Sequence, residues 1–303
     1  MRGPGKNCKD GPELILGAIQ ISQRSTRLRV AEIGEESSSR LLDRSSRVSA
    51  ELRNAERLTA LLMAEIEAAR DAGAVRVEVI ATRSLRGSRL LRLLDRVSRA
   101  AGAGGIQLPG PAEALASTFL SVTKPIASEL PGSIGVARIG ESTGGLAVGT
   151  AGDRPGWIGS RPLGAASLTE RARFSDPPRP NQIEAAINGA VRRFGSLAPP
   201  DCDRFFVSSP HSVVLERLCG PRIDVASARR GLDSILGQTG DDIAAWFGAD
   251  SGQAKLLPAT IVCCLALCEV FEMPVEPRYG DLVAGRAWLD AAARGTAGAK
   301  REA

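Results

Sequence analysis

The chain has 303 residues, of which 43% are hydrophobic and 24% are charged, and it carries a formal net charge of +5. A chain of this length usually builds two domains of about 100–200 residues each. The composition is that of a globular protein and excludes wholesale disorder. The basic balance favours anionic partners without identifying one.

The apolar runs of the chain are short. Residues 14–21 are followed by no small-residue cleavage pattern of the kind that ends a signal peptide. Residues 256–271 fall below the ~20 residues that a membrane helix needs. We therefore expect no membrane association and a cytoplasmic protein.

The cysteines and the single histidine offer little chemistry. Cys263, Cys264 and Cys268 lie on one apolar run, where cysteine behaves as a small buried hydrophobe. No histidine stands close by to complete a zinc site. His211 lies in a Ser-Ser-Pro-His stretch without the partners of a hydrolytic triad. We expect no metal site, and we expect His211 in a loop or at the start of a helix.

The first part of the chain shows the periodicities of alternating strands and helices. Leu28 and Val30 alternate with arginines as in a half-buried strand, and Ser88 stands where a helix begins. Strands are expected over residues 14–21, 26–33, 39–48, 75–79 and 106–108, and helices over 49–72, 88–101 and 111–122.

The second part continues in the same way, with more helix. It predicts a strand, a loop and a strand within residues 136–148. Further strands are expected near 156–160, 205–208 and 273–276, and helices over 165–174, 181–194, 227–236, 241–247, 253–271 and 281–292.

The opening pattern recurs 118 positions later, so that Arg138 falls against Gln20. Residues 136–148 match 18–30, with isoleucine, leucine and valine in register around a small polar loop. Such hairpins can hold a phosphate chain through backbone N–H groups and hydroxyls. We therefore predict two lobes, residues 1–128 and 129–303, each beginning with such a hairpin.

Three segments resemble one known family, the exopolyphosphatase/guanosine-pentaphosphatase (Ppx/GppA) proteins. Residues 163–170 read Leu-Gly-Ala-Ala-Ser-Leu-Thr-Glu and residues 176–180 read Asp-Pro-Pro-Arg-Pro, similar to the family's Leu-Gly-Ala-x-x-Leu-Thr-Glu and Asp-Pro-Pro-x-Pro. Residues 81–86, Ala-Thr-Arg-Ser-Leu-Arg, are similar to its Ala-Thr-Ser-Ala-Leu-Arg.

The resemblance implies an α/β protein of the actin-like ATPase (ribonuclease H-like) fold, with two lobes, a mixed sheet in each, and a cleft between them. Family members cleave terminal phosphates from polyphosphate or guanosine pentaphosphate with Mg²⁺. The family's phosphate-binding positions, carried over to this chain, are Ser22, Arg24, Ser25, Arg86, Arg138, Gly140, Ser142, Thr143 and Gly144.

The departures from the family pattern fall on its acids. Gln20 and Arg138 stand where the two loops have aspartates, and Glu113 is the acid left in the segment of the catalytic glutamate. Mg²⁺ takes oxygen ligands, carboxylates above all, so Gln20 is a poor ligand and Arg138 repels the ion. An arginine can instead hold phosphate by bidentate hydrogen bonds.

The resemblance and these departures together predict a protein that binds polyphosphate or guanosine penta- or tetraphosphate. It would have little hydrolase activity, no cofactor, and Glu113 as its catalytic candidate. An active exopolyphosphatase or guanosine-pentaphosphate phosphohydrolase is the alternative, and Mg²⁺ is then its cofactor. A ligand-free dimeric scaffold is the third hypothesis, and a homodimer is compatible with each of them.

One further pattern concerns anions. Arg89, Arg92, Arg96 and Arg99 recur at helical spacing, opposite a leucine-rich face. Such a stripe is either a solvated face or a ridge that binds polyphosphate. Nucleic acid would use the same charge, but aromatic residues make up only 4% of the chain. Because stacking platforms are then few, we do not expect nucleic acid as a partner.

Overall fold

The computed structural model divides the chain into two compact units, residues 1–109 and 110–303. The residues that it describes are 14–21, 25–33, 38–47, 55–81, 85, 88–248, 251–280 and 284–289. Each unit contains one five-stranded sheet.

The sheet of the first unit opens with three antiparallel neighbours, as predicted. These are β1 (Leu14–Ile21), β2 (Ser25–Ile33) and β3 (Ser38–Arg47). Two strands parallel to β1 complete the order β3-β2-β1-β4-β5, namely β4 (Arg76–Ala81) and β5 (Ile106–Gln107). The result is a mixed sheet.

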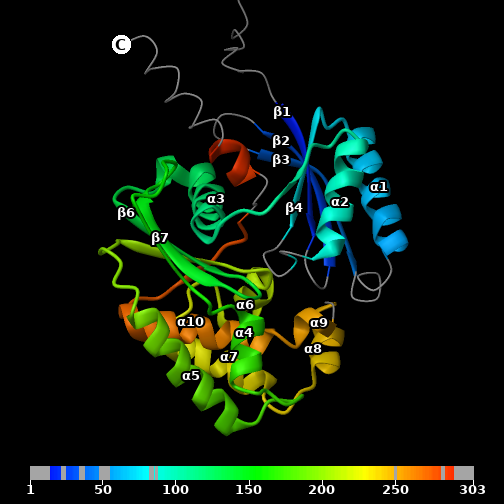
Figure 1. Ribbon diagram of the computed structural model, residues 1–303. Helices are drawn as coiled ribbons and strands as arrows, with labels where there is room; N and C mark the ends of the chain where they lie inside the picture. The colour runs from blue at the N-terminus through cyan, green and yellow to red at the C-terminus, as the bar shows by residue number, and fades with distance from the viewer. Residues whose placement is uncertain are drawn as a thin grey trace, which may run out of the picture. The chain divides into compact units, whose positions relative to one another are not determined.

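Helices α1 (Ala55–Asp71) and α2 (Arg89–Ala100) lie side by side along this sheet (Figure 1). Alternate sheet residues such as Ile19 and Val79 are buried with Leu62 of α1 and Leu94 of α2 in one core. The approach of α1 is close, because a Cβ at Gly17 would lie 2.9 Å from the Cβ of Ala69. Glycine is therefore required where α1 crosses β1.

The sheet of the second unit has the same topology. Its strands are β6 (Ser133–Ile139), β7 (Gly144–Thr150), β8 (Trp157–Arg161), β9 (Arg204–Ser208) and β10 (Glu276–Pro277). Their order is β8-β7-β6-β9-β10, with β6, β7 and β8 antiparallel and β9 and β10 parallel to β6.

The two hairpins share one register. Gln20 pairs with Arg27 between β1 and β2, and Arg138 pairs with Gly145 between β6 and β7. Both partners are displaced by the same 118 positions that relate the two sequence segments. The weak sequence repeat therefore corresponds to a structural repeat of the sheet.

Helix α3 (Pro111–Thr123) corrects the predicted boundary at residue 128. Its Leu115 and Phe119 are buried with Val136, Ala147 and Phe206 on one face of the second sheet. The helix therefore belongs to the second unit, and the division falls after residue 109. The 3₁₀ segment η3 (Lys124–Glu129), where the sequence suggested a linker, continues directly from α3.

Other helices of the second unit pack against the opposite face of its sheet, below β6 and β7 in Figure 1. The largest, α5 (Pro180–Gly195) and α10 (Leu257–Phe271), lie against each other. The remaining ones are α4 (Ala165–Arg171), α6 (Ser212–Cys219), α7 (Val225–Ile235), α8 (Gly240–Phe247) and α9 (Ser251–Ala254). The helix over 284–289 lies instead beside α3, where Gly285 closely approaches the Ser117 carbonyl (Figure 1).

Two helices differ from the sequence analysis. Helix α6 was not among the helices predicted, because its eight residues are too few to show a clear period. The helix expected over residues 253–271 is divided into α9 and α10 by a turn before Pro258, whose ring suits the first turn of a new helix.

Together α9 and α10 form a segment, Ser251–Phe271, that is long and apolar enough by length and composition to cross a membrane. However, 78% of its most apolar window is buried inside the fold. Helix α10 packs on α4, α5 and α7, so it forms the centre of the helical layer. Its apolar character is explained by that position.

The cysteines of the described chain are all unbridged. Cys219, Cys263, Cys264 and Cys268 are buried, and Cys202 is half-buried. Burial raises the pKa of the Cys263 thiol to about 12 and that of Cys219 and Cys268 to about 11. These thiols are therefore neutral at physiological pH and behave as core residues.

Candidate functional site

The loop between β6 and β7, residues 140–143, lies where the sequence places a phosphate-binding turn. It is closed by a hydrogen bond of 3.0 Å from the Gly140 N–H to the Thr143 carbonyl. Gly144 begins β7 so close to the chain that a Cβ there would lie 2.3 Å from the Leu163 carbonyl oxygen. Glycine at position 144 is thus a steric requirement of the loop.

The first turn of α4 anchors this loop. The Ala165 and Ala166 N–H groups donate to the carbonyls of Gly140 and Glu141, each at 2.8 Å. The Ser167 hydroxyl donates to the Ser142 carbonyl, also at 2.8 Å. All three loop carbonyls are therefore turned toward α4.

This anchoring decides where the loop N–H groups point. A trans peptide group directs its N–H opposite to its carbonyl, so the N–H groups of Glu141, Ser142 and Thr143 point away from α4. Within the described chain no acceptor receives a hydrogen bond from any of these three groups. Successive unpaired N–H groups form a concave site of positive potential that suits an anion.

Arg138 adds a full positive charge beside the loop. It is half-buried, and a Cβ at Gly140 would lie 3.0 Å from its Nη1 atom. Burial lowers the pKa of Arg138, while the nearby Glu141 and Tyr279 raise it, and a guanidinium remains charged under any such shift. Among the residues that the structure describes, Arg138 has no hydrogen-bond or ion-pair partner.

No protein-family profile and no curated protein matches this sequence. Among solved structures, the Aquifex aeolicus member of the Ppx/GppA family has a TM-score of 0.76 at 18% identity, covering 93% of this chain and 99% of that chain. An exopolyphosphatase-like protein has a TM-score of 0.76 at 14% identity, covering 92% and 98%. An exopolyphosphatase from Cytophaga hutchinsonii has a TM-score of 0.70 at 14% identity, covering 89% and 96%.

The chain has the Ppx/GppA fold. The prediction of an α/β, actin-like architecture with a mixed sheet in each unit is confirmed. At these low identities the likeness concerns the fold alone, so the chemistry has to be argued from the side chains of this chain.

The first-unit part of the predicted site lies largely outside the described residues. Ser22, Arg24 and Arg86 belong to segments that the structure does not describe, and Ser25 is described only by its place at the start of β2. Gln20 is described, on β1, and is half-buried. The phosphate-binding roles of the four residues stay predictions from the resemblance.

Glu113, the predicted catalytic acid, has a structural function in this Ppx/GppA fold. Its carboxylate accepts a hydrogen bond of 3.3 Å from the Gly110 N–H and so caps α3. The same carboxylate forms an ion pair with Arg286. Both contacts hold this carboxylate at the start of α3, and the catalytic role of Glu113 stays a prediction from the resemblance.

Residues 208–210 lead from the end of β9 into α6. Ser208 lies beside Arg138 in the pairing of β6 with β9, and its hydroxyl accepts from the Gly280 N–H at 3.0 Å. The Ser209 hydroxyl accepts from the His211 N–H at 3.0 Å. Both hydroxyls therefore accept hydrogen bonds from backbone N–H groups of the protein itself. Arg138 is the charged residue next to Ser208 in the sheet.

His211 lies directly before α6, as predicted, and it is buried. Burial lowers its pKa to about 4, against a smaller opposing effect of the Gln253 backbone. The neutral ring donates from Nε2 to the Gln253 carbonyl at 2.9 Å, and its Nδ1 lies 3.0 Å from the Thr260 hydroxyl oxygen. It therefore joins α6 to α9 and α10.

A second polar contact connects this network to the loop. The Gln253 side-chain amide donates to Glu141 Oε1 at 3.4 Å. Glu141, Gln253 and Tyr279 were not selected from the sequence. Glu141 could have been found as a charged residue inside the loop, whereas the other two are brought there only by the fold.

The side chains of the second-unit loop do not fit a Mg²⁺ site. Mg²⁺ requires oxygen ligands, but Arg138 places a cation at the loop, and the nearby carboxylate of Glu141 is bonded by Gln253. The described chain contains no group of three or more histidine, cysteine, aspartate or glutamate side chains that could hold a metal ion. The donors at the loop are thus suited to an anion.

Proposed function

We propose that the chain is a divergent Ppx/GppA-family protein that binds polyphosphate or a guanosine polyphosphate and hydrolyses it little. The observation that carries this proposal is the loop over residues 140–143. Three of its N–H groups point away from α4 without acceptors in the described chain, and the unpaired Arg138 lies beside them.

The chemistry of the contacts favours phosphate. A guanidinium and backbone N–H groups are donors only, and they match the acceptor oxygens of a phosphoryl group. Bidentate hydrogen bonds from Arg138 to two phosphate oxygens would neutralise charge without a metal ion. The predicted partners Ser22, Arg24, Ser25 and Arg86 would add donors of the same kind.

Two features argue for little hydrolysis. The positions of the family's loop aspartates hold Gln20 and Arg138, and the remaining acid, Glu113, is bonded to Arg286 and to the start of α3. Loss of a general base alone typically costs ~10²–10⁴ in rate. A homodimer is compatible with this proposal but is not needed by it.

The test is calorimetric titration of the full chain with tripolyphosphate, once with Mg²⁺ and once with a chelator. We expect equal affinities in both, no phosphate release at the rates of about 1–10³ s⁻¹ that are usual for enzymes, and at least tenfold weaker binding by Arg138→Gln. The exposed Arg192→Gln variant is the charge-matched control.

Binding that requires Mg²⁺, or turnover at an ordinary enzymatic rate, would contradict the proposal and favour the active-enzyme alternative. Restoring both acids, with Gln20→Asp and Arg138→Asp, should abolish metal-free binding. If that double variant kept its affinity in chelator, the loop would not be the site.

A further inference from the structure

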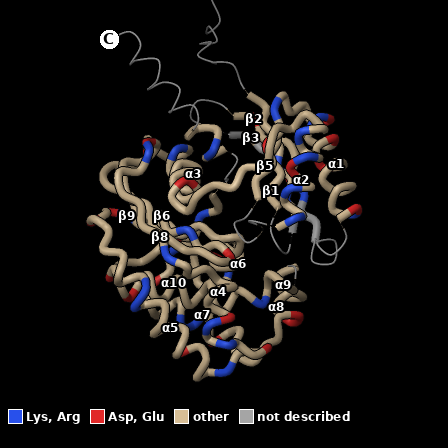
Figure 2. Tube along the Cα trace, viewed as in Figure 1, with Lys and Arg blue, Asp and Glu red and all other residues tan. Residues whose placement is uncertain are grey.

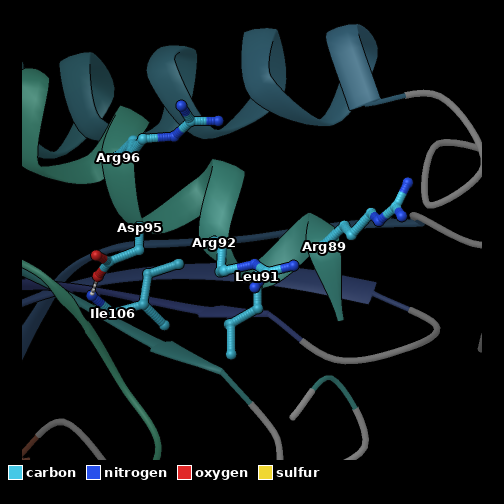
Figure 3. A pocket seen from close by; sticks show the side chains of 6 residues that line it. All are labelled: Arg89, Leu91, Arg92, Asp95, Arg96 and Ile106. Atoms are coloured by element: carbon cyan, nitrogen blue, oxygen red, sulfur yellow. Dashed lines mark hydrogen bonds between the residues drawn. The ribbon is translucent and has the colours of Figure 1, made fainter. Parts of the chain in front are cut away.

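The basic face of α2 forms an open groove in the first unit (Figure 3). The groove has a volume of about 760 Å³ and is lined by Arg89, Leu91, Arg92, Asp95, Arg96 and Ile106. Arginine positions recur along this helix (Figure 2). The arginine stripe seen in the sequence is thus part of a concave surface.

Three of the four stripe arginines are free to meet a ligand. Arg99 pairs with Asp95 at 2.9 Å, and the other Asp95 oxygen accepts from the Ile106 N–H at 2.6 Å. Asp95, the only acid among the described residues that line the groove, is therefore already neutralised. Arg89, Arg92 and Arg96 are exposed, and none has an ion-pair or hydrogen-bond partner among the described residues.

The direction of these side chains is shared. In Figure 3 the guanidinium groups of Arg89, Arg92 and Arg96 all extend the same way along α2, toward its N-terminus, as helical side chains do. With a rise of 1.5 Å per residue, the three charges follow one another at about 4.5 and 6 Å along the axis. They form a line rather than a single point.

This arrangement is unfavourable for the helix itself. Like charges at i, i+3 and i, i+4 destabilise a helix by about 0.2–0.5 kcal/mol per pair. Arg89 also stands in the first turn, which contains no acidic residue and where a cation opposes the helix dipole. A local conflict of this kind is characteristic of a functional surface.

We propose that the groove formed by Arg89, Arg92 and Arg96 binds an extended phosphate chain, as a site separate from the loop over residues 140–143. A linear anion with closely spaced charges can contact all three guanidinium groups, each by paired hydrogen bonds. Among the described residues, the side chains that line the groove include no aromatic ring on which a base could stack. Inorganic polyphosphate therefore fits better than single-stranded nucleic acid.

The experiment compares two triple variants of the full chain. The groove variant carries Arg89→Gln, Arg92→Gln and Arg96→Gln and so loses three positive charges from the groove. The control variant carries Arg192→Gln, Arg217→Gln and Arg230→Gln and so loses the same charge from exposed positions on α5, α6 and α7. Circular dichroism at several temperatures establishes that both are folded, and fluorescence anisotropy measures binding of labelled long-chain polyphosphate at several KCl concentrations.

We expect the groove variant to bind long chains at least tenfold more weakly, with a shallower dependence of log K on log salt because fewer counterions are released. The control should stay within about twofold of wild type. Tripolyphosphate binding should be unchanged in the groove variant and weakened in Arg138→Gln, so failure at one site is distinguishable from failure at the other.

Equal losses in the two triple variants would overturn the proposal, because they would show a general charge effect. Unchanged polyphosphate affinity in the groove variant would overturn it as well. A loss confined to single-stranded RNA of the same charge would replace polyphosphate by nucleic acid as the ligand of this groove, and the proposal would then be wrong.

Discussion

At the scale of single residues, His211 shows how burial sets the protonation of a side chain. Its ring is neutral because burial disfavours the charged form, and this effect outweighs the opposing hydrogen bond to the Gln253 carbonyl. The pKa is about 4 in the folded chain and 6.5 in its usual state. The unfolded chain therefore binds a proton on this ring at a higher pH than the folded chain does.

This difference predicts a pH-dependent loss of stability. Above pH 6.5 both states are neutral and the contribution of His211 is complete, and it declines as the pH falls from 6.5 toward 4. At pH 5 the loss should be about 2 kcal/mol, from 1.36 kcal/mol per pKa unit. Urea unfolding of wild type and His211→Gln at pH 7.5 and pH 5 measures it.

The comparison is clean because the chain has one histidine. Carboxylates titrate in both proteins, so only the difference between them reports His211. If the variant lost as much stability as wild type between the two pH values, the imidazole would not be responsible.

The residues of the site differ in their separation along the sequence, and this separation decides whether a sequence motif can identify them. Arg138, Gly140 and Gly144 follow one another along the chain, so a motif identifies them. Gln253 lies 112 positions from Glu141, and nothing in its neighbourhood in the sequence indicates that contact. Glu113 was found by the same motif logic, but its bond to Arg286 spans 173 positions and could not be expected.

At the scale of elements, the loop over residues 140–143 and α4 act as one piece. The helix begins immediately after Gly164, and a Cβ there would lie 2.3 Å from the Glu141 carbonyl oxygen and 2.5 Å from that of Gly140. Within the family-like segment over residues 163–170, Gly164 is thus required because the chain there approaches the loop closely. The motif therefore indicates the geometry of the loop.

Gly164→Ala should therefore weaken anion binding at the loop. The Gly164 backbone, with φ −98° and ψ 170°, is open to alanine, so the effect comes from the displaced carbonyls. We expect at least a tenfold loss of tripolyphosphate affinity by calorimetry. Gly189→Ala on α5, where no atom lies within 4 Å of the added carbon, is the control and should bind as wild type does.

The strands and long helices were predictable because their apolar residues recur at the right periods. Ser88 was recognised as a cap, and its hydroxyl does accept from the Leu91 N–H. The ends of α4 and α6 were not predictable. The two helices have seven and eight residues, and their bounds depend on contacts with the loop and with β9.

At the scale of the molecule, the division after residue 109 has a measurable consequence. The predicted boundary at residue 128 would separate α3 from the sheet that it covers. In the structure Leu115, Phe119 and Val122 are buried together with residues of β6, β7 and β9. Burial of a side chain of this size contributes about 1.5–3 kcal/mol.

A fragment over residues 110–303 should fold, whereas one over 129–303 should not. The shorter fragment exposes the apolar face that α3 covers, and an exposed face of this kind leads to aggregation. Size-exclusion chromatography and thermal unfolding by circular dichroism compare the two. Equal midpoints for both fragments would show that α3 is dispensable and would support the boundary at residue 128.

The buried thiols of α10 allow opening of the second unit to be measured by alkylation. Only a thiolate reacts with an alkylating reagent, and Cys263, within the helical layer, has neither exposure nor a usable pKa while the second unit is closed. Its modification rate, followed by mass spectrometry, should therefore be proportional to the population in which the second unit is open. The rate should rise with denaturant as that population does. The half-buried Cys202 should react under native conditions, so its modification rate is the internal reference with which the rate of Cys263 is compared.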